Sequence, residues 1–333
     1  KFYRKNRLAV TAAALLLTSL FAGIIGTTVF GVRAKKAQIR AEVAEDQTVS
    51  ALEAMTDQVI QNLIGEKSQY SDAERQFFQV VSDKWEAFAR YKGDSLRAQR
   101  VRADGLVRVA KAKLELGAEA TDAIGRFEDA LLIYDRICEG GRPDHRDLYR
   151  LAVCHHELGF LQLAEKNVAS EHFSRAEQTL KSILQASPND LKSVQLLALT
   201  YMNWALLESG IERLNQAVEL LRPVKEGDQP RQLLAKCLHN LSHNIAASDP
   251  EFARKHIEES VLLMETTCAA HPGSAEYVPD LMLAYDWMAT LIWGQEPDKA
   301  LDVQRKSALQ ADALLLNLEN PLYQAEAARV YYN

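Results

Sequence analysis

Prolines are very unevenly distributed in this 333-residue chain, and their distribution constrains the fold more than any other feature. The chain has nine prolines, and the first of them is Pro143. The long proline-free stretches are rich in Ala, Leu, Glu, Gln and Arg, which lose little side-chain freedom in a helix. Alternating β-branched runs closed by Asn-Gly or Asp-Gly turns, which are typical of strands, are absent. The sequence therefore predicts an all-α protein.

The longest uncharged stretch is Leu8–Val32, with 25 residues. A helix of this length crosses a hydrocarbon core about 30 Å thick. A signal peptide is the main alternative, but its apolar core has only about 7–15 residues. We therefore expect a basic segment at 1–7 and a single transmembrane helix at 8–32. Basic residues flank the stretch equally on both sides, so they do not indicate its orientation.

Charge separates the N-terminal segment of the chain from its body. Residues 1–40 hold eight Lys and Arg and no acidic residue, whereas the remaining residues hold 31 basic and 45 acidic side chains. An acidic body repels the phosphate backbone of nucleic acids. Nucleic-acid binding is therefore not expected, and a partner with a basic or neutral segment is favoured.

Residues 33–99 are expected to form a helical stalk followed by an aromatic helix. Apolar residues recur at helical spacing as far as Ile64, and Ser71 and Glu74 match a capping box at the start of the next helix. In that helix Phe78, Trp85 and Phe88 share one face. We expect this face to pack against the following helix, with a docking surface as the alternative.

A pattern of small and large residues recurs from residue 100 to 333 about five times. A small residue is followed by a second position four residues on and a third position three residues after that: Ala123, Phe127, Ala130; Ala176, Leu180, Ile183; Ala217, Leu221, Val224; Ala253, Ile257, Ser260; and Ala300, Gln304, Ser307. Further small residues precede four of these helices, at Gly159, Ala205, Ser242 and Ala289. Such positions let paired helices cross closely.

This pattern resembles the tetratricopeptide repeat (TPR), a helix–turn–helix unit of about 34 residues. The best match contains Tyr201, Trp204, Ala205 and Ala217, while another repeat carries about five extra residues between its helices, within Glu165–Phe173. The resemblance implies an irregular TPR-like α-solenoid at 100–333. An irregular helical bundle is the alternative.

A stack of such repeats presents an extended concave surface that binds polypeptides. In the family the first helix of each repeat lines this groove. The resemblance therefore implies six candidate partner-binding residues: Asn203, Glu208, His239, Asn240, Asn244 and Asp286.

Three motifs suggest chemistry, and none is complete. His145–Leu148 matches the opening of the protein-kinase H-R-D-L-x-x-x-N loop, but Ala152 stands where the magnesium-binding Asn is required. Pro143 and the nearby aspartates indicate a helix start instead. Cys154–His156, and the pair His239 and His243 one helical turn apart, could suggest metal ligands, but no carboxylate completes a recognised metal signature. We therefore expect no catalytic residue, no metal ligand and no cofactor in this chain.

Four cysteines, Cys138, Cys154, Cys237 and Cys268, show neither C-x-x-C pairs nor zinc-finger spacing. We expect buried small hydrophobic side chains, with a disulfide framework as the alternative.

The order of the segments resembles the C-terminal half of bacterial membrane-anchored serine/threonine protein kinases. The resemblance rests on the juxtamembrane stretch Arg4–Val10, the apolar span, the stalk and the irregular repeats. It implies a single-pass protein of the bacterial cell membrane, with a cytoplasmic N-terminus and a repeat domain outside the cytoplasm. It also implies that the repeat domain is a sensor module that binds a protein or peptide. ATP and Mg²⁺ would belong only to a kinase domain upstream of Lys1. The alternative is a stand-alone membrane-tethered scaffold with no enzymatic domain.

Overall fold

The computed structural model describes residues 33, 35–36, 40, 72–90, 95–115, 117, 119–141, 143–207, 210–272 and 277–315. The chain divides into two units, residues 1–61 and 62–333, and the helices discussed here belong to the second. They are α3 (Asp72–Ala89), α4 (Leu96–Glu115), α5 (Ala120–Glu139), α6 (His145–Leu161), α7 (Lys166–Ala186), α8 (Leu191–Trp204), α9 (Ile211–Leu221), α10 (Asp228–Ile245), α11 (Pro250–Ala270), α12 (Val278–Ile292) and α13 (Pro297–Leu315).

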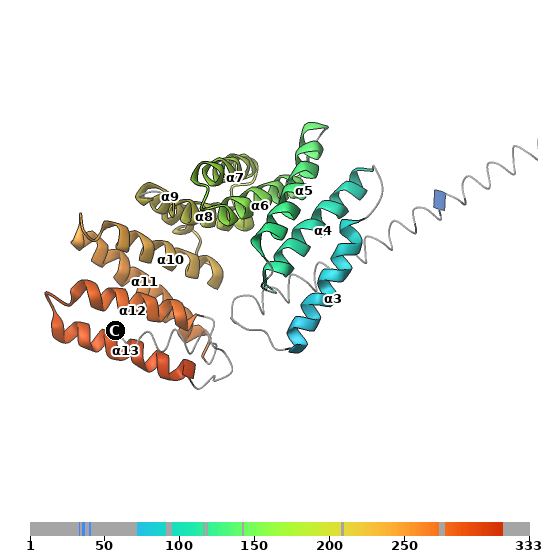
Figure 1. Ribbon diagram of the computed structural model, residues 1–333. Coiled ribbons are helices and arrows are strands. Elements are labelled where there is room, and N and C mark those ends of the chain that lie inside the picture. Colours follow the sequence, from blue (N-terminus) through green and yellow to red (C-terminus); the bar gives the residue numbers. More distant parts are fainter. Residues whose placement is uncertain are drawn as a thin grey trace, which may run out of the picture. The chain divides into compact units, whose positions relative to one another are not determined.

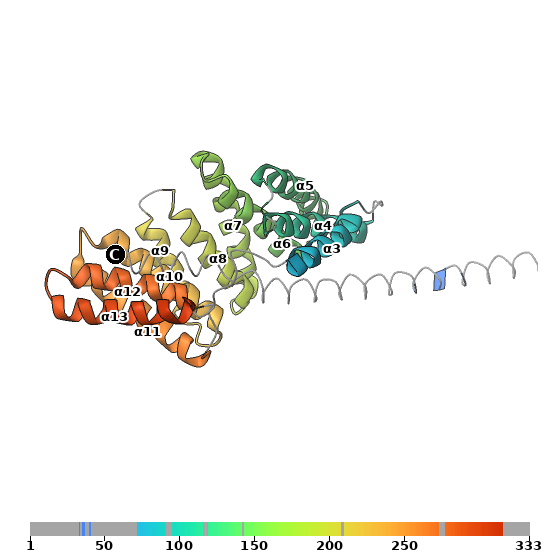
Figure 2. The same ribbon diagram turned by 60° about the horizontal axis from the view of Figure 1, so that its bottom comes forward.

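From α4 onward the helices form five successive pairs, α4/α5, α6/α7, α8/α9, α10/α11 and α12/α13. Each helix packs on the next one in the chain (Figures 1 and 2), and the first helix of each pair also contacts the first helix of the following pair. Contacts of comparable extent do not join the second helices of neighbouring pairs within the described ranges. The first helices α4, α6, α8, α10 and α12 therefore form one face of the stack.

Short polar side chains fix where several helices begin. Asp144 accepts a hydrogen bond from the backbone N–H of Asp147, and the Asp147 carboxylate accepts one from the Asp144 N–H, which completes a capping box for α6. Asp190 caps α8, and Asp249 caps α11 directly before Pro250. These caps satisfy backbone N–H groups that have no partner within the helix.

The small residues that marked the repeats lie at the helix crossings. The five anchor residues have no exposed surface: Ala123, Ala176, Ala217, Ala253 and Ala300. Gly159 of α6 shows how close the approach is, because a Cβ added there would lie 2.8 Å from the ring of Phe173 in α7. The predicted all-α stack of helix pairs is therefore confirmed for the described residues.

Two details of the repeats differ from the sequence prediction. The extra residues from Lys166 onward do not form a loop, because they make up the first turns of α7. In the best-matching repeat, α8 ends at Trp204, so Ala205 lies in the turn after the helix. Helix length, more than loop length, therefore accounts for the irregular spacing at α7.

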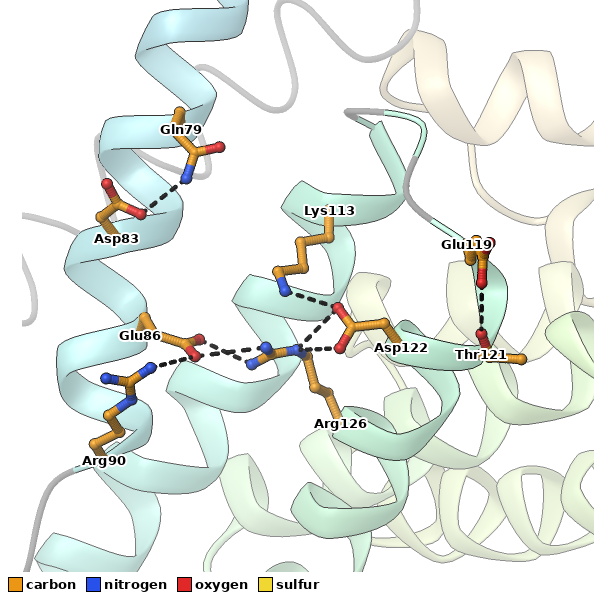
Figure 3. Close-up of polar contacts among 9 residues, drawn as sticks. All are labelled: Gln79, Asp83, Glu86, Arg90, Lys113, Glu119, Thr121, Asp122 and Arg126. Atoms are coloured by element: carbon orange, nitrogen blue, oxygen red, sulfur yellow. Dashed lines mark hydrogen bonds and ion pairs between the residues drawn. The ribbon is translucent and has the colours of Figure 1, made fainter.

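Helix α3 packs on the first pair through its aromatic face. Trp85 is fully buried, and the guanidinium carbon of Arg108 in α4 lies 4.8 Å from its ring centroid, so the predicted packing against the next helix is confirmed for Trp85. Gly105 of α4 permits the approach, because a Cβ there would lie 2.7 Å from the backbone nitrogen of Ala89. At the edge of this contact Arg126 of α5 donates to Glu86 of α3 at 2.8 Å, as Figure 3 shows.

The prediction of a transmembrane helix as part of the fold requires correction. Within the described ranges, none of the helices combines the length and the apolar composition needed to cross a bilayer. The longest of them, such as α7, carry charged side chains throughout, which a hydrocarbon core excludes. Residues 8–32, for which the span was predicted, lie outside the described residues, as do residues 41–64 of the predicted stalk and Ser71 of the predicted capping box. The predicted domain boundaries stay predictions.

Candidate partner-binding groove

Two pockets meet on the face formed by the first helices α8, α10 and α12. The larger has a volume of about 250 Å³ and is lined by Met202, Ala235, Lys236, His239, Asn240, Ser260, Met264, Asp280 and Leu283. The smaller has about 150 Å³ and is lined by Met202, Ala205, Leu206, Leu214, His239, Asn240, His243 and Asn244. Because the pockets share Met202, His239 and Asn240, we describe them together as the first-helix groove.

The groove contains half of the six residues predicted to bind a partner. His239, Asn240 and Asn244 line it from α10, and Asn203 of α8 is half-buried next to the shared wall residue Met202. Glu208 lies outside the described residues. A binding role for these residues stays a prediction.

Asp286 of α12 does not join this group. Its Oδ1 accepts a hydrogen bond of 3.0 Å from the Ser307 hydroxyl of α13. The side chain therefore faces the second helix of its own pair, and Asp286 does not line either pocket of the groove.

Several groove residues were not identified from the sequence. Lys236, His239, Asn240 and His243 are spaced at i, i+3, i+4 and i+7, which places them on one face of α10. That periodicity could have identified Lys236 and His243. Asp280 of α12 could not be identified in this way, because it reaches the groove only through the packing of α12 on α10.

The charged side chains of the groove neutralise each other. Lys236 Nζ lies 3.0 Å from the Asp280 carboxylate, and Gln232 Nε2 donates to the same carboxylate at 2.6 Å. The Lys236 side chain is 41% exposed and that of Asp280 only 18%. The remaining polar rim consists of amides and imidazoles.

One end of the groove is fixed by contacts between α10 and α12. The Trp287 indole N–H donates to the Ser242 hydroxyl at 2.9 Å, and the same indole stacks on His243 with ring centroids 4.4 Å apart. Ser242 is itself fully buried at its helix crossing. These contacts position the His243 ring beside Asn244.

A second open pocket of about 490 Å³ lies between the second helices α7 and α9 over α8. It is lined by Lys181, Leu184, Gln185, Leu197, Tyr201, Gln216, Glu219 and Leu220. The Tyr201 hydroxyl donates to Glu177 at 2.7 Å at its edge. This pocket is the larger one, but it lies between helices that do not line the face of first helices.

The kinase-like stretch His145–Leu148 has a structural role. Asp147 is 1% exposed, belongs to the α6 capping box and accepts hydrogen bonds of 2.7 and 2.5 Å from Arg100. A carboxylate occupied in this way is not available as a catalytic base. The predicted helix start is confirmed.

The Cys154–His156 motif is buried, whereas His239 is half-buried and His243 is exposed. Burial lowers the pKa of His155 to about 3 and that of His156 to about 4, and both imidazoles are therefore neutral at pH 7. His155 pairs with His172 through their Nδ1 atoms at 3.0 Å. All four cysteines are free thiols; Cys154 and Cys237 are buried, as predicted, whereas Cys138 and Cys268 are only half-buried. In the part of the chain that the structure describes, no cluster of three or more His, Cys, Asp or Glu could hold a metal ion.

Several solved structures have a similar helical arrangement. TTC0263, a TPR protein of Thermus thermophilus, is 17% identical over 69% of this chain and 100% of its own, with a TM-score of 0.35. Nro1, a regulator of sterol synthesis and nuclear import adaptor, is 12% identical over 85% and 92%, with a TM-score of 0.46. The TPR2AB domain of yeast Sti1, in a complex with pHSP90, is 15% identical over 86% and 98%, with a TM-score of 0.23.

The described domain is a stack of helix pairs, as the repeat pattern predicted. Likenesses as distant as these three carry no argument about function, and the stack of helix pairs rests on the contacts between its own helices. No protein-family model matches the chain, and no curated protein matches it.

Proposed function

We propose that the repeat domain is a protein-interaction module that binds a polypeptide in the first-helix groove. The observation that carries this proposal is the continuity of two pockets across three successive first helices, with a shared wall at Met202, His239 and Asn240. A groove that crosses several helices suits an extended chain better than a compact small molecule.

Among the described residues, the one carboxylate that lines the groove, Asp280, is occupied by Lys236 and Gln232. The imidazoles and carboxylates with displaced pKa values elsewhere in the domain, such as His155 and Glu177, are occupied by neighbouring side chains. The kinase-like aspartate is a helix cap. Binding is therefore the function that the geometry supports best.

The proposal is tested by selecting peptides from a displayed random library on the immobilised full chain. We expect enriched peptides whose binding is lost in Met202→Glu, because a carboxylate would then stand in the wall that both pockets share. Leu132→Glu is the matched control, since it also replaces an apolar side chain with glutamate, at a position of α5 that is 59% exposed.

Equal loss of binding in both variants, or in neither, would contradict the proposal. Binding that responds instead to Leu220→Glu, at the pocket between α7 and α9, would move the site to that pocket. Circular dichroism melting curves of every variant confirm that the chain remains folded.

We also propose that the chain is the binding part of a larger serine/threonine kinase. Support comes from the resemblance of Arg4–Val10 and of the order of segments to such proteins. A kinase domain encoded directly upstream would support this, and a start codon before Lys1 would favour the stand-alone scaffold. Placement of the repeats outside the cytoplasm belongs to the same proposal, and a compartment-specific reporter fused after Asn333 tests it.

A further inference from the structure

We infer that the first-helix groove takes an uncharged stretch of polypeptide that inserts an aliphatic side chain, and not an acidic chain terminus. The inference rests on the proposed function and adds the chemistry of the partner. It is carried by the charge balance of the groove and by the composition of its floor.

The charge balance disfavours a charged occupant of either sign. Lys236 already pairs with Asp280, and Gln232 completes the hydrogen bonding of that carboxylate. An anion would compete with Asp280 for Lys236 while it is repelled by Asp280 itself. A cation would be repelled by the ammonium group of Lys236. An uncharged occupant leaves the pair intact and avoids the cost of removing a single charge from its partner.

The floor of the groove favours an aliphatic side chain. Met202 and Leu283 line its walls, and Met264 from α11 lies below them with 1% of its surface exposed. Methionine adapts to irregular apolar partners because its side chain is unbranched and polarizable. Leu206 extends this apolar surface out of the groove and is 62% exposed.

The rim can hydrogen-bond the main chain of such an occupant without any net charge. Asn240 and Asn244 both line the groove from α10, and an amide side chain carries both donors and acceptors. The Asn244 Nδ2 donates to the Asn240 backbone oxygen at 2.8 Å, which orients the amide at the surface.

The test uses peptides selected from a displayed random library on the full chain, synthesised with blocked termini. We expect the enriched sequences to share an aliphatic residue flanked by uncharged ones. Their Kd should change less than about twofold between low and high salt, because screening acts on charges. Lys236→Gln should change Kd less than about threefold, whereas Met202→Glu should weaken binding at least about tenfold.

Enrichment of acidic peptides whose binding weakens with salt and falls at least about tenfold in Lys236→Gln would overturn this inference. If such peptides still depended on Met202, the proposed function would stand and only the partner chemistry would be wrong. If no enriched peptide responded to Met202→Glu while Leu132→Glu and wild type behaved alike, both would fail.

Discussion

The interface between α4 and α6 and the groove between α8, α10 and α12 belong to the same stack of helices. They differ in how many charged side chains they contain and in how deeply the carboxylates are buried. Between α4 and α6, Asp104 is 3% exposed and lies 2.6 Å from Arg146 and 3.1 Å from Arg150. Asp147, equally buried, pairs with Arg100. These side chains occupy the face of first helices at this point.

The groove instead holds a single, partly exposed ion pair and apolar side chains. Lys236 and Asp280 pair at its wall, while Met202, Met264 and Leu283 supply its apolar lining. The comparison shows that the first-helix face of one repeat architecture can be filled by buried aspartates paired with arginines or can hold open pockets. The side chains of each interface, not the backbone, decide which occurs.

The largest loss of stability should come from removing a buried carboxylate from the interface between α4 and α6. Asp104→Ala leaves two arginines and the Tyr134 hydroxyl, which donates to Asp104 at 2.7 Å, without their acceptor. We expect a loss of about 3 kcal/mol in the free energy of unfolding. Asp280→Ala, in the open groove, should cost about 1 kcal/mol or less. Urea unfolding of both variants checks this, and equal losses would remove the distinction between the two regions.

The next largest loss of stability should come from a helix crossing, a type of contact that recurs throughout the stack. Ala217→Trp places a large ring at a position with no exposed surface and should cost about 1–3 kcal/mol or more. Glu219→Gln, two residues along the same helix and exposed, should change stability by less than about 0.5 kcal/mol. Thermal melting compares the two variants, and indistinguishable midpoints would argue against a tight crossing at α9.

A pH effect is expected at the junction between the two regions, where His156 of α6 lies 3.0 Å from the Thr200 hydroxyl of α8. Burial lowers the pKa of His156 to about 4 from the 6.5 of an exposed histidine. The unfolded chain therefore binds a proton that the folded chain excludes between these values. The contribution of His156 to stability should fall as the pH decreases from 6.5 toward 4, by about 1.4 kcal/mol per pH unit.

The variant His156→Asn removes this proton uptake, so its unfolding free energy should depend less steeply on pH by that amount. Urea unfolding of wild type and variant at several pH values measures the two slopes. Equal slopes would mean that His156 does not bind its proton differently in the folded and unfolded chains.

The smallest change in stability should come from a substitution in the groove. Lys236→Gln should change the free energy of unfolding by less than about 0.5 kcal/mol, because its partner Asp280 keeps the hydrogen bond from Gln232. A loss of several kcal/mol in urea unfolding would show that the groove, like the interface between α4 and α6, depends on its charge pair.

The sequence predicted those features that depend on local periodicity. Each anchor alanine shares one helix face with the residues four and seven positions after it, and all five alanines are fully buried. The aspartate of the kinase-like stretch was correctly interpreted as part of a helix start. Pro143 and the nearby Asp144 and Asp147 are residues typical of helix N-termini, so neighbouring residues alone indicated this role.

Features that depend on contacts between distant helices could not be predicted in this way. The direction of the Asp286 side chain is set by Ser307, 21 residues away. Asp280 enters the groove because it reaches Lys236 of α10, and the end of α8 at Trp204 depends on how the chain turns toward α9. The sequence therefore located the face of first helices better than the side chains that shape the groove.

The central claim is that a polypeptide binds across α8 and α10, and amide hydrogen exchange with a selected peptide tests it most directly. Peptide binding should slow exchange at residues 199–207 and 232–245, while α4 and α6 exchange at unchanged rates. Slower exchange confined to α7 and α9, around the pocket of Lys181 and Glu219, would contradict the account, as would no change at any of these helices.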